Sequence, residues 1–542
     1  MKFNALDYII LIGYILIILG IGLGVAREKK GKKKNTSDYF LASKGLPWWI
    51  IGSSLIASNI SAEQFIGMSG SGFAIGMGIA SYEFMAAITL IIVAVFFLPI
   101  FLKMGIFTMP EFLEQRYDNR VKTTMAIFWL AVFIFVNLAS ILYLGALTIK
   151  NVIFEGKDLL IMGYNVDPLW FGIIALGAFS ATYSIYGGLK SVAMTDVVQV
   201  VFLIGGGLFT TYVALQYLGD NGNAFDGFIK LTEKAPEKFD MILSKDNPQY
   251  SNLPGISVLI GGMWIANLYY WGCNQYIIQR ALAAKSVKEA QSGLAFAGIL
   301  KLLLPLIVVI PGIVAFVINS DPTNVHHNEI AKPDAAYPWL LHNFVPNGVK
   351  GLAFAALVAA IVSSLASMMN SISTIFTMDI YNCYIKKDAS QTHLVKVGRI
   401  TAGVALLIAI PVAILLQNLD QAFQYIQEFT GFISPGALAI FLLGFFWKKA
   451  TANGALFAAL GTFIFSALLK FATPDLPFMD RMMVVFFICV LIMVIAAYIE
   501  KKPVTSAKSI IYDRSMLVTG RGFKIASFFI IAFLIFIYII WW

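Results

Sequence analysis

The stretch GLAFAGILKLLLPLIVVIPGIVAFVI, residues 293–318, places a single charge, Lys301, in the middle of an apolar run. A cation at membrane depth costs at least about 2.5–3.5 kcal/mol, so it persists only beside a partner or a water-filled cavity. The stretch GFAIGMGIASYEFMAAITLIIVAVFFLPIFL, residues 72–102, holds an acid, Glu83, in the same way. Two opposite charges in two separate membrane segments predict a polar chamber inside a bundle of helices.

The composition points to the same class of protein. The 542 residues are 59% hydrophobic and only 13% charged, whereas soluble domains average about 25% charged residues. We therefore expect an integral membrane protein with little mass in water. The three cysteines, Cys273, Cys383 and Cys489, lie far apart in or beside apolar segments, so we expect them to pack as small apolar side chains.

Fourteen apolar runs are long enough to cross about 30 Å of hydrocarbon. They lie near 7–26, 47–70, 74–102, 123–149, 160–186, 191–217, 255–279, 290–318, 351–382, 397–416, 421–446, 452–471, 482–499 and 523–541. The first run has neither the basic start nor the cleavage site of a signal peptide, so it is expected to be a retained helix. The predicted fold is an all-α integral membrane protein with 14 transmembrane helices, one domain over residues 1–542.

The basic residues predict the orientation. If the N-terminus is outside, the cytoplasmic segments are 27–46, 103–122, 187–190, 280–289, 383–399, 447–451 and 500–524, and they carry most of the 39 Lys and Arg residues. This bias is the one that the positive-inside rule describes, so the net charge of +9 needs no nucleic-acid partner to explain it. We expect the cluster REKKGKKK at 27–34 to anchor this topology, with both termini outside.

Three of the runs contain polar or glycine-rich interruptions. These are SNISAEQF (58–65), NLYYWGCNQY (267–276) and QYIQEFTGFISPG (424–436). Broken helices at corresponding positions of two halves mark the binding site of many transporters. The second and seventh runs are broken and lie five apart, as do the runs with Glu83 and Lys301. This spacing predicts two five-helix inverted repeats, 47–217 and 255–446, each with a broken first helix, preceded by one helix and followed by three.

Polar side chains gather in and near these interruptions: Asn59, Ser61, Glu63, Gln64, Asn137, Asn267, Gln275 and Gln427. Amides both donate and accept hydrogen bonds, and aromatic rings cover apolar faces, so such a set suits a neutral polyhydroxylated solute. For any one residue, a polar contact between helices is an equal alternative. Ser363 and Ser364 either bond to the carbonyl one turn earlier or offer oxygens to a sodium ion.

Several long segments resemble the solute:sodium symporter family, and within it the bacterial sodium/galactose symporters. These are SLIASNISAEQFIGMSGSG (54–72), SYEFMAAITLII (81–92), YSIYGGLKSVAMTDVVQV (183–200), NLYYWGCNQYIIQRALAAKS (267–286), FAALVAAIVSSLASMMNS (354–371), FQYIQEFTGFISPG (423–436) and GFFWKKATANGA (444–455). The likeness runs essentially end to end. It implies a protein of the plasma membrane, here the inner membrane of a bacterium.

The resemblance also implies roles for matching positions. The residues that would hydrogen-bond a sugar are Gln64, Glu83, Asn137, Asn267, Lys301 and Gln427. Tyr270 would stack on the sugar ring and close the cytoplasmic side, with Trp271 beside it, and the outer gate would be Met68, Tyr82 and Phe423. Sodium would bind the carbonyls of Ala57, Ile60 and Ala360 and the hydroxyls of Ser363 and Ser364, with Asp196 on its exit path.

One departure from the family pattern concerns the sugar. The sodium/galactose symporters have a serine among their ligands where this chain has Ala86, three residues after Glu83. The loss of one hydrogen bond weakens binding by about 0.5–1.5 kcal/mol. This change argues against galactose in particular, without disturbing the sugar class.

The resulting prediction is sodium-coupled import of a neutral hexose, galactose or glucose, by alternating access, with Na+ as the coupling ion, no organic cofactor and no enzyme activity. The alternative within this class is another polar solute, such as inositol, a sialic acid or an amino acid; a zwitterion would require unpaired charges. A sugar-gated channel or a sensor is the alternative from another class. A sensor is expected to carry a signalling domain, for which the residues after the last helix leave no room. The oligomeric state stays open.

Overall fold

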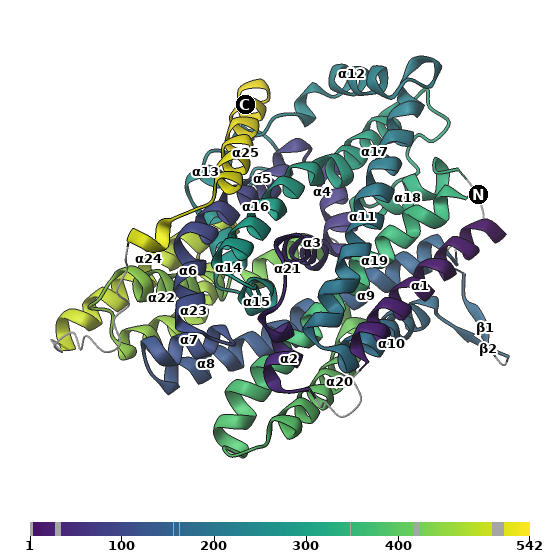
Figure 1. Cartoon of the computed structure of the whole chain (residues 1–542). Helices are drawn as coiled ribbons and strands as arrows, with labels where there is room; N and C mark the ends of the chain where they lie inside the picture. Colours follow the sequence, from purple (N-terminus) through teal and green to yellow (C-terminus); the bar gives the residue numbers. More distant parts are fainter. Residues whose placement is uncertain are drawn as a thin grey trace.

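The computed structural model describes residues 4–27, 34–154, 157–161, 163–346, 348–416, 422–500 and 514–542. Most of the predicted basic anchor, 28–33, lies outside the described residues. The described chain is a bundle of closely packed helices (Figure 1). Its one sheet within that part is a two-stranded hairpin, β1 (Leu159–Ile161) and β2 (Tyr164–Val166), at the edge of the bundle.

The first half of the chain forms α1 to α12. Their bounds are α1 Ala5–Ala26, α2 Thr36–Phe40, α3 Trp48–Asn59, α4 Ser69–Ala74, α5 Ser81–Ile92, α6 Leu98–Met104, α7 Met109–Arg116, α8 Asn119–Ala131, α9 Ala139–Val152, α10 Pro168–Gly187, α11 Leu189–Leu218 and α12 Ala224–Lys234. Three of the breaks between them are π-helical, at Glu63–Met68, Val93–Phe97 and Val132–Leu138. The last two keep their helices continuous across the membrane.

The second half forms α13 to α25. Their bounds are α13 Ser257–Ile260, α14 Gly262–Gly272, α15 Gln275–Leu282, α16 Val287–Leu304, α17 Ile310–Ser320, α18 Ala336–Asn343, α19 Val349–Ile375, α20 Gln391–Leu415, α21 Ala422–Thr430, α22 Ser434–Phe446, α23 Ala452–Ala472, α24 Phe478–Glu500 and α25 Arg521–Ile540. π-Helical segments join α16 to α17 (Pro305–Val309) and extend α19 to Ile385.

The three predicted interruptions are present. α3 ends at Asn59, and Ile60 is extended, with φ −80° and ψ 112°. α14 and α15 are separated at Cys273, and α21 and α22 are separated by a turn after Thr430. Backbone groups freed in this way are tolerated at membrane depth only inside the protein or beside water. The breaks are therefore positions where the bundle interior becomes polar.

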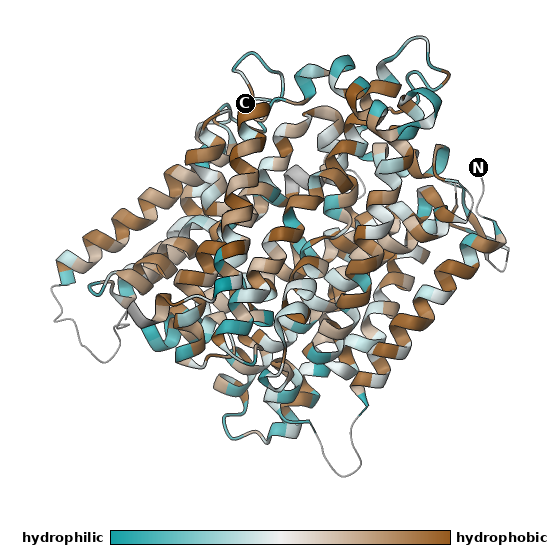
Figure 2. Ribbon diagram, turned by 45° about the horizontal axis from the view of Figure 1, so that its top comes forward, coloured by the Kyte–Doolittle hydropathy of each residue, from teal (hydrophilic) through white to brown (hydrophobic). Residues whose placement is uncertain are grey.

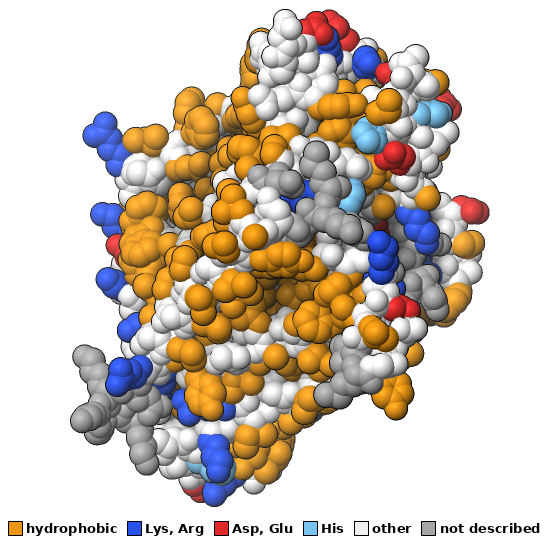
Figure 3. Space-filling view, turned by 90° about the vertical axis from the view of Figure 1, so that its right-hand side faces the viewer, with side chains coloured by type: hydrophobic (Ala, Val, Ile, Leu, Met, Phe, Trp, Pro, Cys, Tyr) orange, Lys and Arg blue, Asp and Glu red, His pale blue; other side chains and the backbone are white. Residues whose placement is uncertain are grey.

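Twelve helices of the described chain are long and apolar enough to cross a membrane. The broken segments at 47–70 and 255–279 are not among them, because each consists of short helices; a twelve-residue helix such as α3 is only about 18 Å long. Figure 2 shows that hydrophobic residues dominate the outer helices, with hydrophilic residues gathered in the loops at the two ends. Figure 3 shows the charged side chains of one face arranged around a wide hydrophobic surface.

Both chain termini lie on one side of the bundle. The backbone amides of Met241 and Ile242, in the long loop after α12, donate to the carbonyls of Trp541 and Trp542 at 2.8 and 3.2 Å. At the other terminus, the Asp7 carboxylate accepts from the amides of Gly348 and Gly351. The loop that follows α12 therefore contacts the C-terminal end of the chain, and the start of α19 contacts the N-terminal helix.

The fifth predicted run starts too early. α10 begins at Pro168 and not near 160, because residues 159–161 and 164–166 are the strands of the hairpin and Asp167 caps the helix. The Asp167 side chain accepts from the amide of Leu169 at 2.9 Å, as an N-terminal cap does. Proline suits the first position of a helix, because the N–H that it lacks would have no partner within the helix there. The hairpin is also a small departure from the all-α prediction.

Candidate functional site

A cavity lies where the broken segments meet. Its walls come from α3 and the π-helical segment after it, α5, α14, α16, α21, α22 and α24. The lining residues are Asn59, Glu63, Gln64, Met68, Tyr82, Glu83, Ala86, Ala266, Asn267, Tyr270, Trp271, Lys301, Gln427, Thr430, Ser434, Phe478, Met479 and Met482.

Lys301 and Glu83 meet at this cavity. The Lys301 ammonium donates to Glu83 Oε2 and to Asn59 Oδ1, and it lies 5.0 Å from the centre of the Trp271 ring. Asn59 Nδ2 in turn donates to the Tyr270 hydroxyl at 3.1 Å. The acid and the base are 3% and 1% exposed, so each charge depends on the other for compensation.

Close helix packing brings these groups together. α16, which carries Lys301, packs against α3 and α5. A Cβ on Gly52 would lie 2.7 Å from the Gly293 carbonyl oxygen, and one on Gly293 would lie 2.8 Å from Ile51 Cβ. Glycine at both positions is therefore required for the backbones of α3 and α16 to approach this closely.

The amide side chains have hydrogen-bonding capacity to spare. Gln64 Oε1 accepts from the amide and hydroxyl of Ser61 at 2.8 and 3.1 Å, and Asn267 Nδ2 donates to the Met263 carbonyl at 3.1 Å. No described group bonds to the other amide atom of either side chain. Buried Glu63 Oε1 likewise has no hydrogen-bond partner within the described chain. An entering polar solute would meet free donors and acceptors here.

Most residues expected to contact a sugar line this cavity, and so do Met68, Tyr82 and Ala86. Asn137 does not; it lies in the π-helical segment Val132–Leu138, and its buried Oδ1 has no partner among the described residues. The side chain of Phe423 lies outside the described residues.

Other lining residues had not been predicted as site residues. Thr430 and Ser434 lie within the interruption at 424–436, so its polar pattern could have identified them. Phe478, Met479 and Met482 are apolar residues of an apolar helix outside the expected repeats. No sequence pattern distinguishes such residues from those that face lipid.

The expected sodium ligands lie at the break after α3. Ser364 Oγ donates to the carbonyls of Ser58 and Ile60 at 2.9 and 3.3 Å. Since Ile60 is extended, its carbonyl points away from the helical ladder, and a hydroxyl and a carbonyl oxygen converge on one point. Ala57 lies in the last turn of α3 and Ala360 lies one turn before Ser364 on α19, and both are fully buried. This donor set fits a hard cation, which prefers neutral oxygens.

Asp196 on α11 lies next to these ligands. It is fully buried and accepts from the Ser363 hydroxyl at 2.6 Å and from the Ser54 hydroxyl. Arg280 Nε donates to Ser54 Oγ at 3.0 Å, and the same guanidinium donates to Ser367 Oγ. Through Ser363, the acid is thus connected directly to the helix that carries the proposed ligands.

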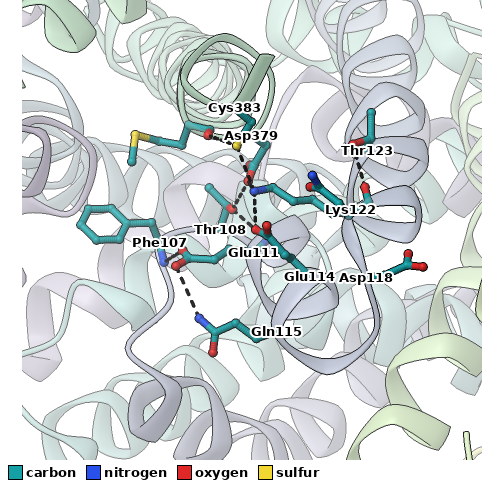
Figure 4. Close-up of polar contacts among 12 residues, drawn as sticks. Phe107, Thr108, Glu111, Glu114, Gln115, Asp118, Lys122, Thr123, Asp379 and Cys383 are labelled. Carbon is teal, nitrogen blue, oxygen red and sulfur yellow. Dashed lines mark hydrogen bonds and ion pairs between the residues drawn. The ribbon is translucent and has the colours of Figure 1, made fainter. Parts of the chain in front are cut away.

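A second buried lysine, Lys122, does not line the cavity. Figure 4 shows its polar partners. Lys122 on α8 donates to Glu114 Oε2 at 2.6 Å and Cys383 Sγ at 3.3 Å, and it lies 3.6 Å from Asp379 Oδ1. Thr108 Oγ1 also donates to that oxygen, at 3.0 Å. The cluster joins α7 and α8 to the π-helical extension of α19.

Comparison with known proteins identifies the family. The family model described as "Sodium:solute symporter family" matches residues 39–461. The chain belongs to the sodium:solute symporter family. It is accordingly a multi-pass membrane protein with sodium as its coupling ion.

Individual members of the family are similar over most of the chain. A sodium/glucose cotransporter of Vibrio parahaemolyticus is 52% identical over 99% of this chain and 98% of its own. A sodium/myo-inositol cotransporter 2 of Mus musculus is 35% identical over 83% of this chain and 67% of its own. The solved structure of a Na+-coupled sialic acid symporter, substrate-bound and outward-open, has a TM-score of 0.77 at 25% identity and covers 92% of this chain and 98% of its own.

Proposed function

We propose that this symporter imports a neutral hexose, glucose or galactose, together with sodium. The observation that carries the proposal is the pairing of Lys301 with Glu83 in a cavity whose other polar lining groups are amides, hydroxyls and the carboxyl of Glu63. Because Glu83 compensates Lys301, no other cation among the described lining residues is available to a carboxylate, whereas the amides and the Glu63 carboxyl can hydrogen-bond hydroxyls. The 52% identity to a protein named as a sodium/glucose cotransporter supports this substrate class.

The same proposal includes the residue roles. Gln64, Glu83, Asn137, Asn267, Lys301 and Gln427 hydrogen-bond the sugar, Tyr270 stacks on it beside Trp271, and Met68, Tyr82 and Phe423 close the outer side. Cavity lining supports all of these roles except those of Asn137 and Phe423. No covalent chemistry is required of any of these groups, so we propose no enzyme activity.

The proposed architecture has 14 membrane helices, the twelve long ones and the two broken segments at 47–70 and 255–279. The first inverted repeat is 47–217 and the second is 255–446, with one helix before and three after. We place the protein in a bacterial inner membrane with both termini outside. The bias of Lys and Arg toward the opposite ends of the helices supports this orientation.

Coupling would operate through the break after α3. Sodium bound by the carbonyls of Ala57, Ile60 and Ala360 and the hydroxyls of Ser363 and Ser364 would hold α3 against α19, and α3 also carries Asn59, the partner of Lys301. Sodium would then leave past Asp196. An inward membrane potential adds about 2.3 kcal/mol per charge per 100 mV. Because coupling of affinities is reciprocal, sugar tightens sodium binding as much as sodium tightens sugar binding.

The alternative within the same class of symporter is myo-inositol. Ala86 lines the cavity three residues after Glu83, and its methyl group offers no hydrogen bond to either solute. The mouse relative at 35% identity is named for myo-inositol. A cyclic polyol is also neutral and polyhydroxylated, so it suits the same cavity.

Uptake of labelled glucose, galactose and myo-inositol into proteoliposomes tests the proposal. We expect saturable hexose uptake that requires an inward sodium gradient and is stronger than uptake of myo-inositol. Uptake of none of the three, or hexose uptake indifferent to sodium, would overturn the proposal. Sodium-driven uptake of myo-inositol alone would make the alternative correct.

A further inference from the structure

The first turn of α24 forms one wall of the cavity, although α24 lies outside both proposed repeats. Phe478, Met479 and Met482 from this turn all line the cavity. Met479 and Met482 are only 1% and 5% exposed. This wall is apolar, whereas Lys301, Glu83 and the amides come from other elements. A solute in the cavity therefore has polar partners on one flank and thioether and ring groups on another.

A smaller pocket lies behind this wall. It is lined by Glu428, Gly431, Phe432, Ser466, Phe478, Arg481 and Met482. Two of these, Phe478 and Met482, line both spaces. Their side chains consequently form the partition between the central cavity and the second pocket.

Polar contacts hold the partition in place. Asp480 Oδ1 accepts from the Ser257 hydroxyl at 2.6 Å, and Arg481 donates to Glu428 Oε1 at 2.7 Å. These two neighbours tie the turn to α13 and to α21. A Cβ on Gly262, at the start of α14, would lie 2.2 Å from the Met479 carbonyl oxygen, so α14 and α24 touch at their backbones.

The geometry points to Phe478 and Met482 as specificity-determining residues that limit the size of the transported solute. This inference rests on the proposed hexose transport and adds a limit on the size of the transported solute. The partition separates the cavity from the second pocket, so truncating either side chain would open that pocket to a substituent on the sugar ring. Methionine is flexible, so the limit is set by the volume of these two side chains and not by a hydrogen bond.

The test is competition by the phenyl glycoside of the transported hexose against uptake of the labelled hexose in proteoliposomes. Met482→Ala joins the two spaces, and Phe478→Ala does so from a less buried position, where a folding defect is less expected. Met493→Ala is the matched control, because Met493 is a fully buried methionine of the same helix that does not line either space. The readout is the ratio of the inhibition constant of the glycoside to the KM of the hexose.

We expect this ratio to fall by about tenfold in Met482→Ala and Phe478→Ala, since one methyl-sized group changes discrimination in an apolar pocket by about 10- to 200-fold. In Met493→Ala it should stay at the value of the unchanged protein. A ratio that moves no further in the two wall variants than in Met493→Ala, with hexose uptake intact, overturns the size limit alone. Absence of hexose uptake by the unchanged protein removes the proposed function and this inference with it.

Discussion

Two lysines of this bundle are buried beside carboxylates, and they differ in what surrounds them. Lys301 has one acid, Glu83, one amide, Asn59, and an aromatic ring, and it borders a cavity. Lys122 has two acids, Glu114 and Asp379, and a thiol, and it is not among the residues that line the cavity. An ammonium has three protons to donate. Each ammonium donates two hydrogen bonds to described partners. Lys122 has a second acid, Asp379, at 3.6 Å, whereas Lys301 has no second acid within ion-pair distance among the described residues.

The difference separates two uses of a buried charge. Lys122, which lies beside two acids and does not line the cavity, holds helices together: it joins α8 to the π-helical extension of α19. Lys301, which lies beside one acid and borders a cavity with unpaired amide atoms, can donate its remaining proton to a solute. Breaking either pair leaves an uncompensated buried charge, so only the effect on transport distinguishes them.

The largest expected effect is that of Lys301→Ala. Removing the ammonium takes away a proposed sugar ligand and leaves Glu83 and Asn59 without their partner, so hexose uptake should fall to background. Sodium should still raise the melting temperature of the purified variant, because the proposed sodium ligands are elsewhere. Normal hexose affinity in this variant would contradict the assignment of Lys301 to the site.

Lys122→Ala should lower the stability of the protein and leave its affinity for the hexose unchanged. Loss of one partner of a buried pair costs about 3–5 kcal/mol, and the partial exposure of Glu114 lowers that figure here. We expect a lower melting temperature and less folded protein, with the KM for the hexose unchanged in the protein that does fold. A KM raised as much as in a cavity variant would end the distinction between the two lysines.

Ser364→Ala should raise the sodium requirement. Hydrogen bonds to charged groups contribute about 1.5–3 kcal/mol, which corresponds to roughly a 10- to 150-fold higher half-saturating sodium concentration if the hydroxyl bonds to sodium with similar strength. Ser373→Ala is the matched control, since this serine of the same helix donates to the Gly398 carbonyl at 2.7 Å, away from the break. Equal sodium dependence in the two variants would remove Ser364 from the ligands.

Ala86→Ser is expected to have the smallest effect, and it tests the cavity that Lys301 borders. A new hydroxyl in the cavity offers one hydrogen bond of about 0.5–1.5 kcal/mol, so the preference among hexose epimers should shift by about 2- to 13-fold. Ala87→Ser, at the next position and outside the lining residues, should leave the ranking as it is. An identical ranking in Ala86→Ser would mean that position 86 does not contact the sugar.

The sequence was most informative where charge or polarity broke an apolar pattern. Lys301 and Glu83 could be predicted as site residues because each is isolated in a long apolar run. The breaks at 58–65, 267–276 and 424–436 could be predicted because they place polar and glycine residues at membrane depth. Their meeting at one cavity follows from the fold. The family resemblance supplied Asn137 as a sugar ligand, but that residue does not line the cavity.

Other features left no such pattern. Met482 and Phe478 look like any apolar residues of a membrane helix, and only the packing of α24 against α14 and α22 brings them to the cavity. The early start predicted for α10 has a similar cause, since a short apolar strand, Leu159–Ile161, has the same hydropathy as a helix end. In both cases tertiary structure, and not local composition, decides the outcome.

Equilibrium binding of labelled hexose to purified protein, in sodium and in choline, compares the two lysines most directly. The central claim is that the Lys301–Glu83 pair forms part of a hexose site, whereas the Lys122 cluster does not. We expect sodium-dependent binding in Lys122→Ala with the Kd of the unchanged protein, and no measurable binding in Lys301→Ala. Binding of equal affinity in both variants would contradict the claim.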